Sequence, residues 1–469
     1  MTAAFPAVHQ PVGVTYSQSG STRDGILVIN ESIDTFAMTR ERLDNLRRLR
    51  SPIPDFRRSV RTLIFVASSF RGGSSFLAEI LRHSSALLHF QGEMQPILKL
   101  AGWNYPENNA DSDRIQQVTG DPGLLEEELG SDVGFPINDW GSVDSERFAV
   151  DLLWRWIVQW PMEQISLEEA QAIATRVLNS INLDRSIPHK DLSIDIHCKI
   201  LRELVDRHPM VDPYYGDLPW HKVRAYFPDL PTPSGPHSPT IFEWAPLAMP
   251  GPWQRAGQAD VSAQAVVSKA PVNAYKIQAI HDFFPNARLR ILHLTRNPGA
   301  TIDSLREGWL SPWFFNQRVD TLLAISGYTS PGRPWSTSWW KMDFPPGWQE
   351  LTHASLEEIC TRQWYEIHRS ILDFSEANSV DLFQLRHEDL IGGREKRVKV
   401  TLALAEWLEV DPSELLEPVL SGLPPMVSIV PPRPGKWRRN YEIISPQLQK
   451  PEITEMAHSL GYHDMSSWI

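Results

Sequence analysis

The chain has 469 residues, of which 42% are hydrophobic and 22% charged, which is the composition of an ordinary soluble globular protein. Its formal net charge of −12 argues against a nucleic-acid-binding protein, which would carry a basic surplus. Two cysteines, Cys198 and Cys360, exclude a disulfide framework and a cysteine metal site, and no apolar run reaches the roughly 18 residues of a membrane span.

Residues 1–55 are expected to form an N-terminal arm that is ordered only in part. Within it, residues 38–50 predict a short helix rich in arginine. A solvated basic helix is the plain interpretation, and the alternative is a helix that braces the binding site described below. The plain interpretation predicts that the arginines are exposed, namely Arg40, Arg42, Arg47, Arg48 and Arg50.

A strand-to-helix junction follows. Residues 62–67 are strand formers, and apolar residues at helical spacing begin at Phe76. Between them lies Arg71-Gly72-Gly73-Ser74-Ser75, a glycine-rich turn that opens a helix and presents unpaired backbone N–H groups, with the positive end of the helix dipole behind them. The Arg71 side chain and two serine hydroxyls add donors. The junction predicts a site for a phosphate-like anion, and an ordinary turn is the alternative.

The segment from about residue 100 to 262 is expected to be a large insert, helical in its first half and rich in loops in its second. Ser166-Leu167-Glu168-Glu169 is a capping box before an apolar-periodic run, and residues 195–205 predict another helix. Residues 209–252 hold many prolines, which excludes a continuous helix or a central strand. Long structured loops of this kind often serve as lids or binding loops.

Three more strands are predicted at residues 264–269, 288–294 and 380–386, with helices between them. This alternation predicts an α/β fold with a parallel central sheet and flanking helices. In such sheets ligands bind at the carboxyl ends of the strands, and the glycine-rich turn lies at such an end.

A second candidate anion site lies at the end of the strand 288–294. Arg296 follows the strand, Asn297 is a good N-cap, and Pro298 is a good first helical residue. Ser304 lies two turns into the helix, so Arg296 and Ser304 can converge on one anion. The alternative is an ordinary junction with a solvated arginine.

Tryptophan is abundant, with 18 residues. These side chains could line a binding pocket or simply pack an irregular subdomain. Two segments concentrate them, a helix-like one with Trp154, Trp156 and Trp160, and a loop-rich one at about 308–350 with Trp309, Trp313, Trp335, Trp339, Trp340 and Trp348.

Together the two anion signatures resemble the PAPS-dependent sulfotransferases. In that family a loop like Arg71–Ser75 holds the 5′-phosphosulfate of 3′-phosphoadenosine 5′-phosphosulfate (PAPS). A strand end like Arg296-Asn297-Pro298, with a serine eight residues after the arginine (304 minus 296), holds the 3′-phosphate. Gly72 and Ser74 depart from the family's usual serine and threonine. The backbone cradle remains, and Ser74 still supplies a hydroxyl.

Three further segments extend the resemblance, which covers roughly residues 60–95 and 262–465. They are Lys269-Ala270-Pro271, the strand end Arg386-His387-Glu388-Asp389-Leu390, and the loop Gly435-Lys436-Trp437-Arg438, which in the family closes over the nucleotide. The resemblance implies a P-loop-NTPase-like sulfotransferase fold over residues 56–469, with PAPS as donor, PAP as product and no metal. The insert and the 308–350 segment would then bind the acceptor.

The resemblance also nominates residues for the chemistry. Glu93 lies where tyrosine and related bacterial sulfotransferases carry a Gly-Glu pair that supplies the general base. A surface carboxylate is the alternative, and His89 is the reserve base. Lys269 and Arg71 are expected to stabilise the charge that develops on the departing phosphate. We find no counterpart of the K-T-H segment that supplies a histidine base in the cytosolic phenol and steroid enzymes.

The expected activity is therefore sulfuryl transfer from PAPS to a hydroxyl of an acceptor with hydrophobic surface. A small secondary metabolite or a lipid is favoured over a glycan or a protein. Competing interpretations are a phosphotransferase with a degenerate P-loop, although no G-x-x-x-x-G-K-[ST] occurs, and an inactive scaffold. The N-terminus has no signal peptide, so a soluble cytoplasmic protein is expected.

Overall fold

The computed structural model describes most of the chain, and its main compact unit spans Thr35–Ile469. Residues 1–34, the larger part of the expected N-terminal arm, lie outside the described residues, as do Trp313 and most of the proline-rich stretch after residue 231. The described ranges are 35–108, 110–115, 120–137, 139–180, 189–215, 218–231, 235–236, 250–312, 315–423 and 433–468.

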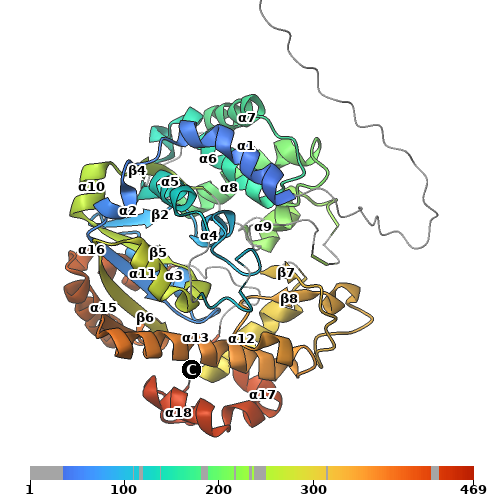
Figure 1. The fold of residues 1–469 in the computed structure, drawn as a ribbon, viewed down its shortest axis with the longest axis vertical. Helices are drawn as coiled ribbons and strands as arrows, with labels where there is room; N and C mark the ends of the chain where they lie inside the picture. Colours follow the sequence, from blue (N-terminus) through green and yellow to red (C-terminus); the bar gives the residue numbers. More distant parts are fainter. Residues whose placement is uncertain are drawn as a thin grey trace, which may run out of the picture. The chain divides into compact units, whose positions relative to one another are not determined.

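A seven-stranded sheet organises this unit, in the order β4-β3-β2-β5-β1-β6-β9 (Figure 1). The parallel strands are β2 (Leu87–Phe90), β5 (Ala265–Lys269), β1 (Thr62–Ala67), β6 (Arg288–Thr295) and β9 (Asp381–Arg386). They include all four strands that the sequence predicts. The expected α/β fold with a parallel central sheet and flanking helices is therefore confirmed.

Three short strands of the sheet were not predicted. β2 extends the parallel part, and β3 (Val133–Pro136) and β4 (Trp253–Arg255) then add an antiparallel edge beyond it. The insert thus contributes to the sheet as well as to the helices. A separate two-stranded ribbon joins β7 (Asn316–Arg318) to β8 (Trp339–Lys341) in the loop-rich segment.

The central strands are buried on both faces, as parallel strands usually are. Along β1, Leu63 and Phe65 enter one hydrophobic core, and Ile64 and Val66 enter the other. This alternation follows from the two-residue period of a strand. The helices that supply the smaller core include α3 (Ser74–Leu81), α15 (Arg394–Leu408) and α16 (Pro412–Ser421), and those of the larger core include α12 (Pro298–Leu310) and α13 (Leu356–Asn378).

Further helices complete the two layers. Around the central strands these are α10 (Gln258–Ala263), α11 (Ile277–Phe283), α14 (His387–Ile391), α17 (Tyr441–Leu448) and α18 (Pro451–Ser459). α2 (Phe56–Ser59) precedes β1. On the chain between β1 and β4 the further helices are α4 (Gln95–Leu100), α5 (Pro122–Asp132), α6 (Ser145–Gln159), α7 (Leu167–Ser180), α8 (His189–Val205) and α9 (Trp220–Tyr226). In Figure 1, α5 to α8 group near the β2 and β4 end of the sheet.

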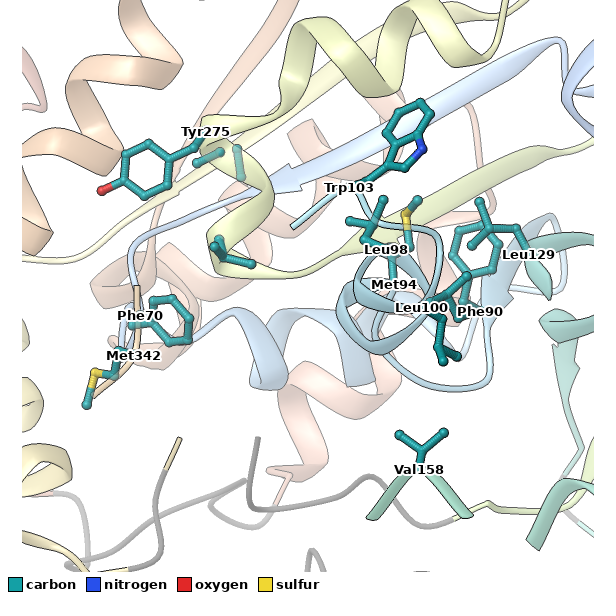
Figure 2. Packing of buried hydrophobic residues seen from close by; sticks show 14 of the residues in the cluster. Phe70, Phe90, Met94, Leu98, Leu100, Trp103, Leu129, Val158, Tyr275 and Met342 are labelled. Atoms are coloured by element: carbon teal, nitrogen blue, oxygen red, sulfur yellow. The ribbon is translucent and has the colours of Figure 1, made fainter. Parts of the chain in front are cut away.

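The helices of the insert confirm its expected helical half. The Ser166 hydroxyl caps α7 by accepting a hydrogen bond from the Glu169 N–H at 3.1 Å, as the capping box predicts. Buried side chains of the insert join the core of the sheet, and Figure 2 shows Leu129 of α5 beside Phe90, Met94 and Leu98. The insert is therefore continuous with the main hydrophobic core.

The predicted N-terminal helix is present as α1 (Thr35–Arg50), but the expected exposure of its arginines is wrong in part. Arg48 is exposed, whereas Arg40, Arg42 and Arg47 are half-buried. Arg50 is 1% exposed and makes ion pairs with carboxylates of α5 and α6. Burial of a guanidinium is tolerated here because these partners neutralise it.

Three of the described tryptophans of the 308–350 segment pack against one another. Trp309, Trp340 and Trp348 are almost fully buried, and the Trp340 ring centroid lies 4.9 Å from that of Trp309 and 5.1 Å from that of Trp348 in edge-on contacts. Trp154 and Trp156 in α6 are also buried. These side chains therefore stabilise the loop-rich segment and the insert. Over the described ranges, no helix is both long and apolar enough to cross a membrane.

Candidate functional site

Four neighbouring parallel strands bring the predicted site residues to one edge of the sheet. Glu93 follows β2, Lys269 ends β5, the loop 68–75 follows β1, and Arg296 follows β6. Because these strands are adjacent and parallel, their carboxyl ends lie side by side. This edge is where ligands bind in open α/β sheets.

The glycine-rich loop has a backbone that requires its two glycines. Gly73 precedes α3 with φ +97°, and a Cβ there would lie 2.1 Å from the His387 ring. A Cβ at Gly72 would lie 2.3 Å from Ser68 Oγ. Arg71 itself adopts φ +63°, a conformation that L-residues rarely occupy outside constrained sites. The loop is thus held in a fixed shape at the N-terminus of α3.

Both predicted anion signatures meet at this loop. Arg71 Nε donates to Ser304 Oγ at 3.0 Å, and Arg296 Nη1 donates to the Arg71 carbonyl at 3.0 Å. The Arg296 and Arg71 contact joins residues 225 positions apart in the sequence. Ser304 and Arg296 therefore converge as the spacing of eight residues predicts, and the loop of the first signature lies between them.

The electrostatics of this cluster favour an anion. Burial and the positive charge of Arg296 lower the pKa of Arg71 to about 10. Burial also lowers the pKa of Arg296. Two partly buried guanidinium groups that lie close to each other raise the local positive potential. A phosphate between them would relieve both effects and would accept charge-assisted hydrogen bonds.

A second layer of buried side chains fixes the turn that carries Arg296. Glu388 accepts hydrogen bonds from the Asn297 backbone N–H at 2.9 Å, from its Nδ2 at 2.8 Å and from the Tyr462 hydroxyl at 2.7 Å. Asn297 Oδ1 caps α12 through the Ala300 N–H at 2.8 Å, as predicted. The Arg386–Leu390 motif was visible in the sequence, but no signal there indicates the roles of Glu388, His387 or Tyr462.

Glu93, Lys269 and Ser75 form a second cluster beside the loop. Lys269 Nζ donates to Ser75 Oγ at 3.1 Å and makes a short ion pair with Glu93 Oε1. The side chains of Lys269 and Glu93 are 15% and 26% exposed, so the pair lies at the edge of the site and solvent reaches it. The structure therefore brings the two predicted catalytic side chains together, next to a hydroxyl of the first turn of α3.

His89 lies in a different environment. It is in the middle of β2, 3% exposed, and burial together with the charge of Arg82 lowers its pKa to about 3. Its Nε2 has no hydrogen-bond partner among the residues that the structure describes. A group with this pKa is a weak proton acceptor at neutral pH.

The loop Gly435–Arg438 attaches to α12, the helix that carries Ser304. Lys436 Nζ contacts Glu307 at 2.5 Å, and the Trp437 ring is so close to Gly299 that a Cβ there would lie 2.9 Å from it. The Arg438 guanidinium lies 5.0 Å from the centroid of Trp437 and donates to the Ser466 carbonyl at 2.8 Å. Gly435 provides the turn with φ +65°. Residues 424–432, just before this loop, are outside the described ranges.

Similarity searches add the following. No family model matches this sequence, and no curated protein matches it. Two solved structures are similar, each over 86% of this chain and at 14% identity. One is the sulfotransferase domain from the curacin biosynthetic pathway, of which 98% is covered with a TM-score of 0.33. The other is the sulfotransferase domain from the Synechococcus PCC 7002 olefin synthase, of which 95% is covered with a TM-score of 0.32.

Proposed function

We propose that this protein is a PAPS-dependent sulfotransferase that transfers a sulfuryl group to a hydroxyl of its acceptor. The observation that carries the proposal is the convergence of Arg71, Arg296 and Ser304 at the ends of β1 and β6. Two sequence motifs with the family's spacing meet in space, and the basic groups at their meeting point favour a bound anion.

This geometry supports the following mode of donor binding. The backbone N–H groups of Gly72, Gly73, Ser74 and Ser75, with the Arg71 guanidinium, would hold the 5′-phosphosulfate at the start of α3. Arg296 and Ser304 would hold the 3′-phosphate. We assign the loop Gly435, Lys436, Trp437 and Arg438 to the same nucleotide site, where its attachment to α12 would let it cover the donor and support the helix that carries Ser304.

The chemical step needs a base for the acceptor and positive charge for the leaving group. The Glu93 carboxylate takes the proton of the acceptor hydroxyl as its oxygen forms a bond to sulfur. The bond between sulfur and the bridging oxygen breaks, and that oxygen stays on the 5′-phosphate of PAP. Lys269, between Glu93 and Ser75, lies where its ammonium can stabilise this developing charge, and Arg71 is the second candidate. His89 remains the reserve base.

For the acceptor we propose a hydroxylated compound with hydrophobic surface, a secondary metabolite or a lipid, with a glycan as the alternative. The insert and the 308–350 segment present many aromatic side chains, and pockets for such compounds are lined mainly by apolar and aromatic groups. The described members of this group pack the core, so any acceptor contacts come from the remaining surface of these segments.

The test is transfer of labelled sulfuryl from PAPS to a panel of hydroxylated phenols, sterols, lipids and glycans. We expect label in at least one acceptor class and stoichiometric release of PAP, both abolished in Arg71→Ala. Transfer of phosphate from ATP to the same panel, with no transfer from PAPS, would contradict the proposal and favour the phosphotransferase interpretation. A matched control is Arg369→Ala, which removes an exposed arginine from α13, outside the insert and the 308–350 segment.

A further inference from the structure

A cluster of buried charges lies directly behind the turn that carries Glu93. Asp132, at the end of α5, is its centre: Oδ1 accepts hydrogen bonds from Arg50 Nη2 and from Arg155 Nη2, both at 3.0 Å. The side chains of Arg50, Asp132 and Arg155 are 1%, 0% and 3% exposed. Three separate helices, α1, α5 and α6, therefore meet at one carboxylate.

Arginines and carboxylates pair throughout the cluster, which explains how it tolerates burial. Arg50, Arg147 and Arg155 face Glu128, Asp132 and Asp151, and Arg47 of α1 adds a further contact to Glu128 at 3.3 Å. The Trp154 indole closes it, since Nε1 donates to Glu128 Oε2 at 3.0 Å, and the guanidinium groups of Arg50 and Arg155 lie 4.9 and 4.6 Å from its ring centroid. Although burial opposes it, the charges of Arg155 and Arg50 lower the pKa of Asp132, so this group stays a carboxylate.

Two residues of this cluster, Asp132 and Arg155, contact the turn. The second oxygen of Asp132, Oδ2, accepts a hydrogen bond from the Gly92 N–H at 3.3 Å, and the Asp132 carbonyl accepts one from the Gln91 N–H at 3.2 Å. The Arg155 guanidinium lies against Gly92, where a Cβ would be 2.6 Å from Nη2. Glu93 is the next residue.

The flanks of the turn are also fixed. Phe90 ends β2 and Met94 precedes α4, and both are buried in the hydrophobic core, where Figure 2 shows them close together. The turn between them is short. Its backbone is held by the hydrogen bonds of the Gln91 and Gly92 N–H groups to Asp132, and also by Arg82 Nη2, which donates to the Phe90 and Gln91 carbonyls at 3.2 and 3.1 Å. A general base must lie within hydrogen-bond reach of the proton that it removes, and small displacements of such a group are costly to the rate.

We propose that Asp132 and Arg155 are positioning residues for Glu93, and that Arg50 makes the helix α1 part of the support of the site. The effect on turnover rests on the proposed function, whereas the effect on the position of the Glu93 turn does not. Buried ion clusters contribute little net stability compared with apolar packing, and in some proteins they specify geometry, which is the role proposed here. Of the two interpretations of α1, the arrangement thus favours the helix that braces the site.

The structural part is tested by hydrogen exchange in the full-length protein. Arg155→Lys keeps the charge but loses the planar fork that lies on Gly92. We expect exchange of the peptide that contains Gly92 and Glu93 to accelerate about tenfold or more, with exchange of the loop 68–75 unchanged. Arg290→Lys is the matched control, because Arg290 is also buried and pairs with a carboxylate, Asp381, away from the turn. Equal acceleration in both variants would overturn the inference.

The effect on turnover is tested by introducing Arg155→Lys into the native protein and into the Glu93→Gln variant. Arg155→Lys should lower kcat about 10- to 100-fold, with the KM for PAPS and the affinity for PAP within about twofold. In a Glu93→Gln background the same substitution should cost almost nothing further, because a residue that acts through Glu93 has no effect once the base is absent. Additive losses would refute positioning. If the native protein transferred nothing from PAPS, the proposed function would fail, and the exchange experiment would still decide the structural part.

Discussion

At the scale of single residues, two clusters of side chains support the proposed function. Arg71, Arg296 and Ser304 form the proposed anion site, and Glu93, Lys269 and Ser75 form the group beside it. Sequence reasoning identified five of these residues because each lies at the end of a predicted strand or in the first turns of the following helix. Glu93 follows a strand that was not predicted, and only the resemblance to the family's Gly-Glu pair nominated it. Sequence reasoning gave no role to Glu388, Tyr462 or Asp132, because a buried carboxylate whose partners are distant in the sequence leaves no local pattern.

Arg296→Ala tests the 3′-phosphate site. The substitution removes the guanidinium that is proposed to bind this phosphate, and loss of a charge-assisted hydrogen bond costs roughly 1.5–3 kcal/mol of binding free energy. Calorimetric titration with PAP should therefore show an affinity that is lower by about 10- to 150-fold. The same titration with AMP, which lacks the 3′-phosphate, should change little. A parallel loss for both nucleotides would assign Arg296 to another part of the donor.

Glu93→Gln separates catalysis from binding. Glutamine keeps the size of the side chain but cannot take a proton at neutral pH, so turnover should fall by about 10²–10⁴ while the affinity for PAP stays within a few-fold. Steady-state kinetics and PAP titration measure the two quantities independently. Near-normal turnover would remove Glu93 from the mechanism and would return attention to His89.

At the scale of elements, four parallel strands and the loops that follow them were predictable, whereas β2 and the antiparallel edge formed by β3 and β4 were not. β1, β5 and β6 are largely buried strands, β9 is a partly buried one, and each is followed by a helix, so their pattern is distinct. β2, β3 and β4 have only three or four residues each. The buried end of α1 was missed for a similar reason: Arg50 pairs with Glu128 and Asp132, 78 and 82 residues away.

The junction of β1 and α3 gives a prediction at this scale. Gly73→Ala would place a methyl group against the His387 ring and would force a side chain into a backbone conformation with φ +97°. The loop must then change shape, so we expect PAP binding to be lost or to weaken by at least about tenfold, as expected for a displaced anion cradle. Gly332→Ala is the control, because nothing lies within 4 Å of the Cβ there. Unchanged PAP binding in Gly73→Ala would contradict the assigned role of the loop.

At the scale of the whole molecule, the buried histidines predict acid sensitivity. Burial lowers the pKa of His89 and His293 to about 3 and that of His197 to about 4, compared with 6.5 for the free side chain. Between those values the folded protein binds fewer protons than the unfolded chain. The contribution of these neutral histidines to the free energy of unfolding is therefore fully present above pH 6.5, and it decreases as the pH falls towards 4.

Denaturant unfolding at pH 7 and pH 5 measures this loss. Each fully buried histidine should contribute on the order of 1–2 kcal/mol over this interval. His293→Gln should lower the pH dependence by about one such contribution, because glutamine does not titrate. An unchanged pH dependence in this variant would show that burial of His293 does not cause the loss of stability at low pH.

The most direct test of the central claim is thermal unfolding with PAP, AMP and ATP. A ligand that binds the native state alone raises Tm, and at 100 times its Kd it stabilises the protein by about 2.7 kcal/mol. If Arg71, Arg296 and Ser304 form a site for the donor nucleotide, PAP should raise Tm clearly, whereas AMP and ATP, which lack the 3′-phosphate, should raise it much less. Equal shifts with all three nucleotides, or none with PAP, would contradict the account.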